Sequence, residues 1–213
     1  MKIVLAEIKE ALQKNLDGCF LEEGFKLRKA DFEYTKKVND LRFIYRISIH
    51  SKSGWYSITP EVYVGSSKIN KRFNEILNRQ IQVTGTTCGF GIANETDQQR
   101  GRYQVVEIHE ISSAAESILS DFKDIALPFY NKVNSHEAID KYLNAITENK
   151  APVGSVSNAC FGLIVANIVN NPRFSELADV YFNFWSKSQS PEIAKDIIAV
   201  KNALLGTTDV IKA

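Results

Sequence analysis

An alternating pattern at residues 41–49 constrains the fold more than any other feature of the sequence. Large apolar side chains take every second position: Leu41, Phe43, Tyr45, Ile47 and Ile49. The positions between them are mostly polar, with a cationic bias. Because successive side chains of a β-strand point to opposite faces of the sheet, this pattern predicts a strand with one buried and one polar face.

Further strands are predicted on both sides of this one. Residues 51–54 have turn chemistry, and residues 55–64 form an aromatic and β-branched run. The short connection favours antiparallel pairing. Pro60 lacks an N–H group, so we expect the second of these strands to be a sheet edge or to bulge at Pro60. Residues 25–34 and 103–108 predict an earlier and a later strand, and short strands are possible within residues 81–102.

Helical periodicity precedes and follows the strands. Apolar residues recur at three- and four-residue spacing over residues 3–22, which predicts an amphipathic helix. The helical period returns at residue 111 and predicts helices near 111–125, 135–146, 158–170, 174–187 and 191–205. We expect Pro128 to lie beyond the end of the first of these helices.

The order of these elements predicts an α+β fold. We expect an antiparallel sheet of four to six strands with an N-terminal helix and a C-terminal helical segment. Turn residues at 152–157 favour a division into an α+β sheet domain at 1–150 and a helical extension at 151–213 that packs on it. A chain of 213 residues is long enough to bury a core without a metal or disulfide.

Composition excludes several classes of function. The net charge is only +1, which gives no strong drive toward nucleic acid or membrane surfaces. The longest apolar run, at residues 159–169, falls well short of the roughly 20 residues that a membrane-spanning helix needs. The N-terminal apolar run is too short for a secretory signal. We therefore expect a cytoplasmic protein that does not contact membranes.

No pattern of a metal or cofactor site is present. The three histidines are widely spaced, and His109-Glu110 does not continue into an HExxH zinc motif. The three cysteines form no CxxC pair. The glycines at 89 and 91 lack the third glycine and the helix of a dinucleotide fingerprint. We expect no metal and no cofactor.

Cys88 is the most enzyme-like residue of the chain. It lies among glycines and threonines at residues 86–91, where backbone N–H groups can stabilise a thiolate. A cysteine-dependent enzyme would also need a base, for which His50 and His109 are the candidates, and no local spacing brings either to Cys88. We keep this enzyme as a second alternative and expect no catalysis.

Basic and aromatic residues gather on the polar face of the central strand and at the following hairpin. They are Arg42, Arg46, His50, Lys52, Trp55 and Tyr56. Cations beside aromatic rings hold single-stranded nucleic acid by phosphate neutralisation and base stacking. Trp, Tyr and Arg also dominate the energetics of protein interfaces. A solvated sheet face would look the same. We predict a protein-binding surface and keep an RNA- or DNA-binding module as the first alternative.

The chain also resembles a known family. An N-terminal helix leads into Gly24-Phe25-Lys26, several strands follow, and a later helix carries Leu127-Pro128-Phe129. This order is similar to that of the α+β proteins of domain-of-unknown-function family 4304. The resemblance covers about residues 5–145; residues 81–102 and the helical tail depart from it. It implies a bacterial protein without enzymatic activity, and an immunity-type role in which the protein occludes the active site of a toxin.

Overall fold

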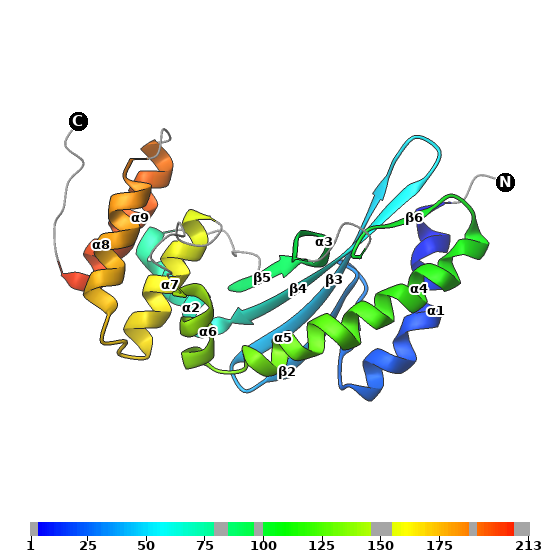
Figure 1. The fold of residues 1–213 in the computed structure, drawn as a ribbon, viewed down its shortest axis with the longest axis horizontal. Coiled ribbons are helices and arrows are strands. Elements are labelled where there is room, and N and C mark those ends of the chain that lie inside the picture. The colour runs from blue at the N-terminus through cyan, green and yellow to red at the C-terminus, as the bar shows by residue number, and fades with distance from the viewer. Residues whose placement is uncertain (1–3, 79–84, 96–99, 146–154, 188–190, 207–213) are drawn as a thin grey trace. The chain divides into compact units, whose positions relative to one another are not determined.

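The computed structural model describes residues 4–78, 85–95, 100–145, 155–187 and 191–206. The chain divides into two compact units. Residues 1–64 and 89–132 form the first, which we call the sheet unit, and residues 65–88 and 133–213 form the second, which we call the helical unit. The predicted α+β class is confirmed, as is the expected sheet with an N-terminal helix and C-terminal helices (Figure 1).

The sheet is antiparallel and has six strands, within the predicted range. The strands are β1 (Lys26–Arg28), β2 (Glu33–Val38), β3 (Leu41–Ser51), β4 (Tyr56–Ser66), β5 (Cys88–Gly91) and β6 (Tyr103–Val105). Their order is β1-β2-β3-β4-β5, and β6 pairs with β4 as well. Of the uncertain segment 81–102, β5 is one strand that the sequence favoured, whereas residues 81–83 lie outside the described residues.

The two faces of the sheet unit follow the alternation in the sequence. Leu41, Phe43, Tyr45 and Ile47 are buried. They lie on the face that is covered by the helices α1 (Leu5–Glu22), α4 (Ile111–Asp121) and α5 (Leu127–Lys132) (Figure 1). Most side chains of the opposite face are half-exposed or exposed, and we call this the open face.

Aromatic rings form the centre of the core beneath the sheet. Phe20 of α1 stacks on Tyr34 of β2 at 4.0 Å between ring centroids and lies 4.1 Å from Phe122. Tyr45 and Phe25 also pack against Phe122. These five rings connect α1, the strands and the helix that follows α4 into one apolar cluster, which explains why the N-terminal helix packs on the sheet.

Pro128 does not end the helix that precedes it. A π-helical segment, Phe122–Ala126, joins α4 to α5, so that helical structure runs on through Pro128 to Lys132. In a regular α-helix the proline ring would clash with the carbonyl group four residues earlier, at Asp124. The wider π-turn shifts that carbonyl relative to the ring, and the helix continues.

Pro60 lies in an interior strand, which excludes the sheet edge, one of the two alternatives that the sequence left open. The Lys52 N–H donates a hydrogen bond to the Trp55 carbonyl at 2.8 Å, so the main-chain groups of Trp55 point toward β3. Because these groups alternate in direction along a strand, every second residue after Trp55 also points its main-chain groups toward β3. The nitrogen of Pro60 therefore points away from β3. On that side β6 pairs with β4 up to Ile58, and β5 lies beside Val62. Pro60 falls between these two neighbours, where no hydrogen-bond donor is needed.

The helical unit consists of helices from two distant parts of the chain. They are α2 (Ser67–Leu77), α6 (His136–Leu143), α7 (Val156–Ile168), α8 (Phe174–Trp185) and α9 (Pro191–Leu205). Two short elements, α3 (Ile92–Glu95) and the 3₁₀ turn η1 (Ile108–Glu110), belong to the sheet unit. No helix in the described parts of either unit is long and apolar enough to cross a membrane.

The compact units do not follow the expected boundary near residue 150. Both α2 and α6, which the sequence placed in the sheet domain, belong to the helical unit. Phe73 of α2 packs on Phe161 of α7 at 4.7 Å between ring centroids. Asn144, at the end of α6, donates a 2.9 Å hydrogen bond to the carbonyl of Gly162 in α7. Because α7 is buried almost all round, it needs these neighbours to cover it.

Candidate functional site

The six predicted contact residues do not form one patch. Arg42 and Arg46 lie on the open face, on the row of β3 opposite to the buried Tyr45. His50 and Lys52 lie further along, where β3 turns into the hairpin. Trp55 directly precedes β4 and shares their hairpin.

Arg46 is the centre of an ion-pair ladder that crosses four strands. Its guanidinium lies 2.7 Å from Oε1 of Glu33 on β2 and 3.7 Å from Glu61 on β4. Glu33 in turn lies 3.7 Å from Arg28 on β1. The Arg46 guanidinium also covers the ring of Tyr63 at 5.2 Å. Glu33 is only 4% exposed, so its charge depends on these partners.

The ladder gives Arg46 a structural role that competes with binding. Its charge is shared between two carboxylates, and its flat face already contacts an aromatic ring. A partner that recruited Arg46 would have to replace these contacts. We therefore regard Arg46 as a residue that holds β2, β3 and β4 in register rather than as a first contact.

Arg42 lies at a more cationic end of the open face. Its cross-strand neighbour on β2 is Lys37, which is exposed. Arg42 is half-exposed, and the described residues include no ion pair or hydrogen bond to its side chain. Asp40, in the turn between the two strands, is the carboxylate nearest in sequence. This end of the face is thus available to an acidic group.

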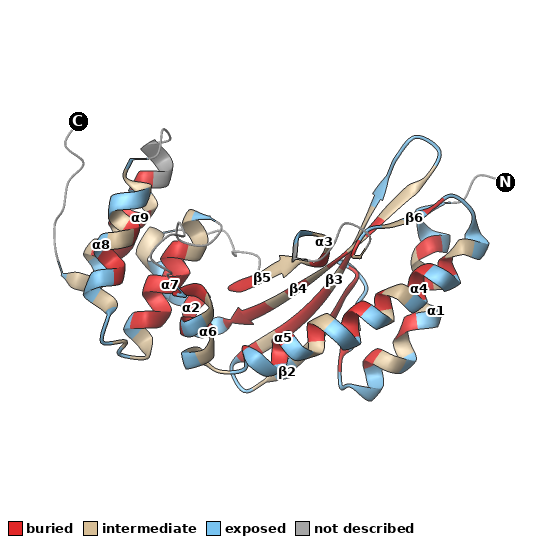
Figure 2. Cartoon of the chain, viewed as in Figure 1, coloured by how far each residue is buried: buried red, intermediate tan, exposed pale blue. Residues whose placement is uncertain are grey.

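The β3–β4 hairpin extends beyond the rest of the sheet (Figure 1). Burial of the β3 row ends at Ile47, since Ile49 is half-exposed and His50 is exposed. Lys52 is exposed and Trp55 half-exposed, and Figure 2 shows the exposed tip. Tyr56 pairs with Val105 of β6. Its side chain points to the other face of the sheet from that of Trp55, so it does not share a face with Arg42.

Distance separates Arg42 and Arg46 from the aromatic residues of the hairpin, whereas Lys52 lies beside Trp55. Lys52 follows Arg42 by ten positions, just past the end of β3, which corresponds to roughly 33 Å. The aromatic ring of the middle region, Tyr63, is covered by Arg46. A stacking surface for single-stranded nucleic acid needs open rings beside cations. Arg46 therefore offers no open ring to a base, whereas the hairpin brings Lys52 beside the half-exposed Trp55.

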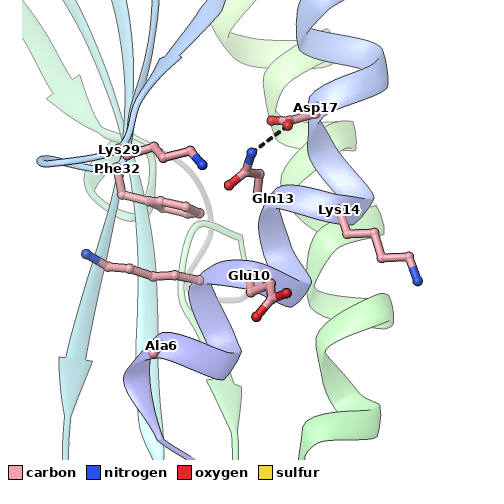
Figure 3. A pocket seen from close by; sticks show the side chains of 8 residues that line it. Ala6, Glu10, Gln13, Lys14, Asp17, Lys29 and Phe32 are labelled. Carbon is pink, nitrogen blue, oxygen red and sulfur yellow. Dashed lines mark hydrogen bonds between the residues drawn. The ribbon is translucent and has the colours of Figure 1, made fainter.

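A separate pocket lies between α1 and the β1–β2 connection (Figure 3). It has a volume of about 650 Å³. Phe32 lines it with a nearly buried ring, and the ammonium group of Lys9 lies 5.8 Å from the centre of that ring. The Asp17 carboxylate accepts hydrogen bonds from Gln13 at 2.9 Å and from Tyr34 at 2.7 Å. Lys14 points away from Phe32.

The groups of this pocket do not form an acid–base pair. Both carboxylate oxygens of Asp17 already accept a hydrogen bond. Burial, together with the hydrogen bond to Asp17, raises the pKa of Tyr34, which keeps its hydroxyl protonated as a donor. Asp17 is thus occupied by structural hydrogen bonds, of which the one from Tyr34 joins β2 to α1.

Burial makes Cys88 a poor nucleophile. The side chain is 3% exposed, and burial raises the pKa of its thiol to about 12. The thiolate population at neutral pH therefore falls by about three orders of magnitude relative to a free cysteine. Cys160 is also buried, whereas Cys19 is half-exposed. This finding argues against the alternative of a cysteine-dependent enzyme.

We expect Cys19 to react with a disulfide reagent such as DTNB at least about tenfold faster than the two buried thiols, because access and thiolate formation limit the reaction. Stopped-flow absorbance of the native chain measures this rate, and labelling in urea gives the total of three thiols. The fast phase should vanish in Cys19→Ser and persist in Cys88→Ser. A fast phase that vanishes in Cys88→Ser instead would reinstate Cys88 as a candidate nucleophile.

The described residues contain no cluster of three histidine, cysteine or carboxylate side chains that could hold a metal ion. His109 lies 3.2 Å from Glu107 at the surface of the sheet unit. His136, in the helical unit, contacts the Ser66 hydroxyl at 3.0 Å. Ser66 is fully buried as the N-cap of α2, so this Ser–His contact serves the start of that helix.

Comparisons of this chain with protein-family models, with curated proteins and with solved structures yield no match. The resemblance to family 4304 therefore stays a prediction.

Proposed function

We propose that the chain is a non-catalytic protein-binding module that contacts its partner with the β3–β4 hairpin and the adjoining open face. The observation that supports this function is the position of Trp55, which is half-exposed on a hairpin that extends beyond the sheet. Exposed His50 and Lys52 flank it. Tryptophan is among the residues most enriched in interface hot spots, because it fills a pocket of the partner and excludes water there.

The resemblance to family 4304 adds a class of partner. In this proposal the partner is a bacterial toxin, and the hairpin and the open face occlude its active site. Occlusion needs shape and charge complementarity but no chemistry from the inhibitor. The net charge of only +1 and the contacts of Arg46 with Glu33, Glu61 and Tyr63 support the ranking of a protein partner above nucleic acid.

The two tryptophans of the chain provide a matched test. Trp55 lies at the hairpin, and Trp185, also half-exposed, ends α8 in the helical unit. Tagged wild-type chain, Trp55→Ala and Trp185→Ala are expressed in the source organism and pulled down at low and at high salt. We expect the wild type and Trp185→Ala to retain one stoichiometric protein at high salt. Trp55→Ala should lose it, since truncation of a hot-spot residue costs about 2 kcal/mol or more.

Two results would contradict this function. A partner that Trp55→Ala and Trp185→Ala retain equally would exclude the hairpin as the contact. Nucleic acid that is recovered at low salt and released at high salt, without a protein, would favour the nucleic-acid alternative, because phosphate contacts weaken steeply with salt. Circular dichroism of both variants confirms that they are folded.

A further inference from the structure

Charges on the open face pair differently in the middle of the sheet and where β2 turns into β3. In the middle, both cross-strand neighbours of Glu33 carry the opposite charge: Arg28 on β1 and Arg46 on β3. Close to the turn, Lys37 lies directly opposite Arg42. Like charges that face each other on neighbouring strands are destabilising, so this pair lowers the stability of the sheet.

The described residues supply no direct partner for this pair. Lys37 is exposed and Arg42 is half-exposed, and neither side chain forms an ion pair or hydrogen bond with a described residue. The next row of the face, between the pair and the ladder, has exposed Lys26 opposite Thr35. Side chains at every second position share a face, so Lys26 adds a third cation to it. We call Lys26, Lys37 and Arg42 the cationic end.

The nearby carboxylates leave the cationic end with excess positive charge. Asp40, in the turn between β2 and β3, is exposed, and its charge counted in full leaves a net charge of +2. The ladder is further away, since Glu33 precedes Lys37 by four positions of β2, or roughly 13 Å. That separation exceeds the Debye length of about 8 Å at physiological ionic strength, and the ladder carboxylates have arginine partners of their own.

The chemistry of the cationic end fits a carboxylate from outside the chain. A guanidinium binds a carboxylate through two parallel hydrogen bonds, and a neighbouring ammonium group adds a second charge. Such a ligand replaces the repulsion between Lys37 and Arg42 with attraction to both. Single-stranded nucleic acid also needs open rings beside the cations, and Tyr63 of the open face is covered by Arg46. An arrangement that opposes the stability of its own fold is expected at functional sites.

We propose that the cationic end of the open face binds an acidic patch of the partner protein, whose carboxylates pair with Arg42 and Lys37. This inference rests on the proposed function and adds to it the charge of the partner's surface. The cationic end lies at the start of β3 and the hairpin at its end, so either contact can be absent without the other. A substitution that removes the repulsion should raise stability and weaken binding.

Lys37→Glu tests the effect on stability, with Lys14→Glu as its control. Lys14 is an exposed residue of α1, which covers the other face of the sheet, and its replacement changes the net charge equally. In urea titrations we expect a higher midpoint for Lys37→Glu than for the wild type, because the new carboxylate lies opposite Arg42. Lys14→Glu should not raise the midpoint.

A displayed library of random short peptides, selected on the immobilised full-length chain, provides the binding probe. The selected sequences should be rich in Asp and Glu, and fluorescence polarisation then measures the affinity of synthetic copies. We expect affinity to fall at least about tenfold in Lys37→Glu and by less than about twofold in Lys14→Glu. Circular dichroism confirms that both variants are folded.

Trp55→Ala separates this inference from the proposed function. Peptides that Lys37→Glu binds as tightly as the wild type overturn the inference, and their loss in Trp55→Ala would leave the hairpin contact standing alone. Peptides that only Lys37→Glu loses support the cationic end. A selection without an acidic consensus, or a lowered urea midpoint of Lys37→Glu, overturns the inference. So does a single-stranded oligonucleotide that binds the wild type more tightly than the selected peptides do and loses affinity in Lys37→Glu.

Discussion

Replacement of Phe20 by alanine is expected to lower the free energy of unfolding of the sheet unit by about 3–5 kcal/mol. Phe20 is fully buried, and its ring contacts Tyr34 and Phe122 at about 4 Å between centroids. The substitution leaves a cavity bounded by rings from α1, β2 and the π-helical segment. Because these rings are held by separate elements, they cannot collapse together to fill it.

Leu21 provides the control for this change. It is the next residue of the same helix and is 58% exposed, so Leu21→Ala should alter stability by less than about 0.5 kcal/mol. Trp55 and Trp185 lie in different units, so a Trp185→Phe background leaves Trp55 to report on the sheet unit in urea titrations. Equal stabilities of Phe20→Ala and Leu21→Ala would show that the aromatic cluster does not hold α1 on the sheet.

The alternation in β3 was sufficient to predict the sheet and its two faces. Tyr45 and Ile47 are buried as the pattern requires, and Arg42 and Arg46 lie on the opposite face. An alternation with a period of two assigns each side chain of a strand to one face of the sheet, and this assignment needs no knowledge of the neighbouring strands. The pattern does not predict the exposure of Ile49. This residue continues the apolar row, but it is half-exposed because the hairpin there leaves the core.

The partners of Arg46 were beyond what a single strand pattern can show. Glu33 and Glu61 lie 13 and 15 positions away, and only the registers of β2 and β4 bring them to Arg46. The signal was present in part, because Glu61 and Tyr63 alternate with apolar residues of β4. Together with the turn predicted at residues 51–54, this alternation places them opposite β3 on the polar face.

The compact units differ from the expected division near residue 150 for a similar reason. Turn residues at 152–157 mark a break between two helices, but they do not state which helices pack together. Phe73 and Asn144 are assigned to the helical unit by contacts with α7, a helix that is distant from α2 in sequence. The apolar character of residues 159–166 on all sides was the available signal that α7 needs neighbours all round.

The second large effect concerns a glycine in the middle of α7. Gly162 lies against a buried polar network, in which Asn144 accepts a 2.7 Å hydrogen bond from Tyr181 and donates one to Asp140 at 2.7 Å. A Cβ atom at position 162 would lie 2.6 Å from Oδ1 of Asn144. Gly162→Ala should therefore displace Asn144 and destabilise the helical unit by about 1–3 kcal/mol, although alanine is the better helix former.

Gly18, in α1, is the matched control because it is also helical but has nothing within 4 Å of an added Cβ atom. Gly18→Ala should raise stability by about 0.5–1 kcal/mol, as expected for an unhindered helix position. The two substitutions thus have opposite expected signs, measured in urea with Trp185 as the reporter for Gly162→Ala and Trp55 for Gly18→Ala. If both variants gained stability, α7 would have room to move away from α6, and the Asn144 network would not determine how these helices pack.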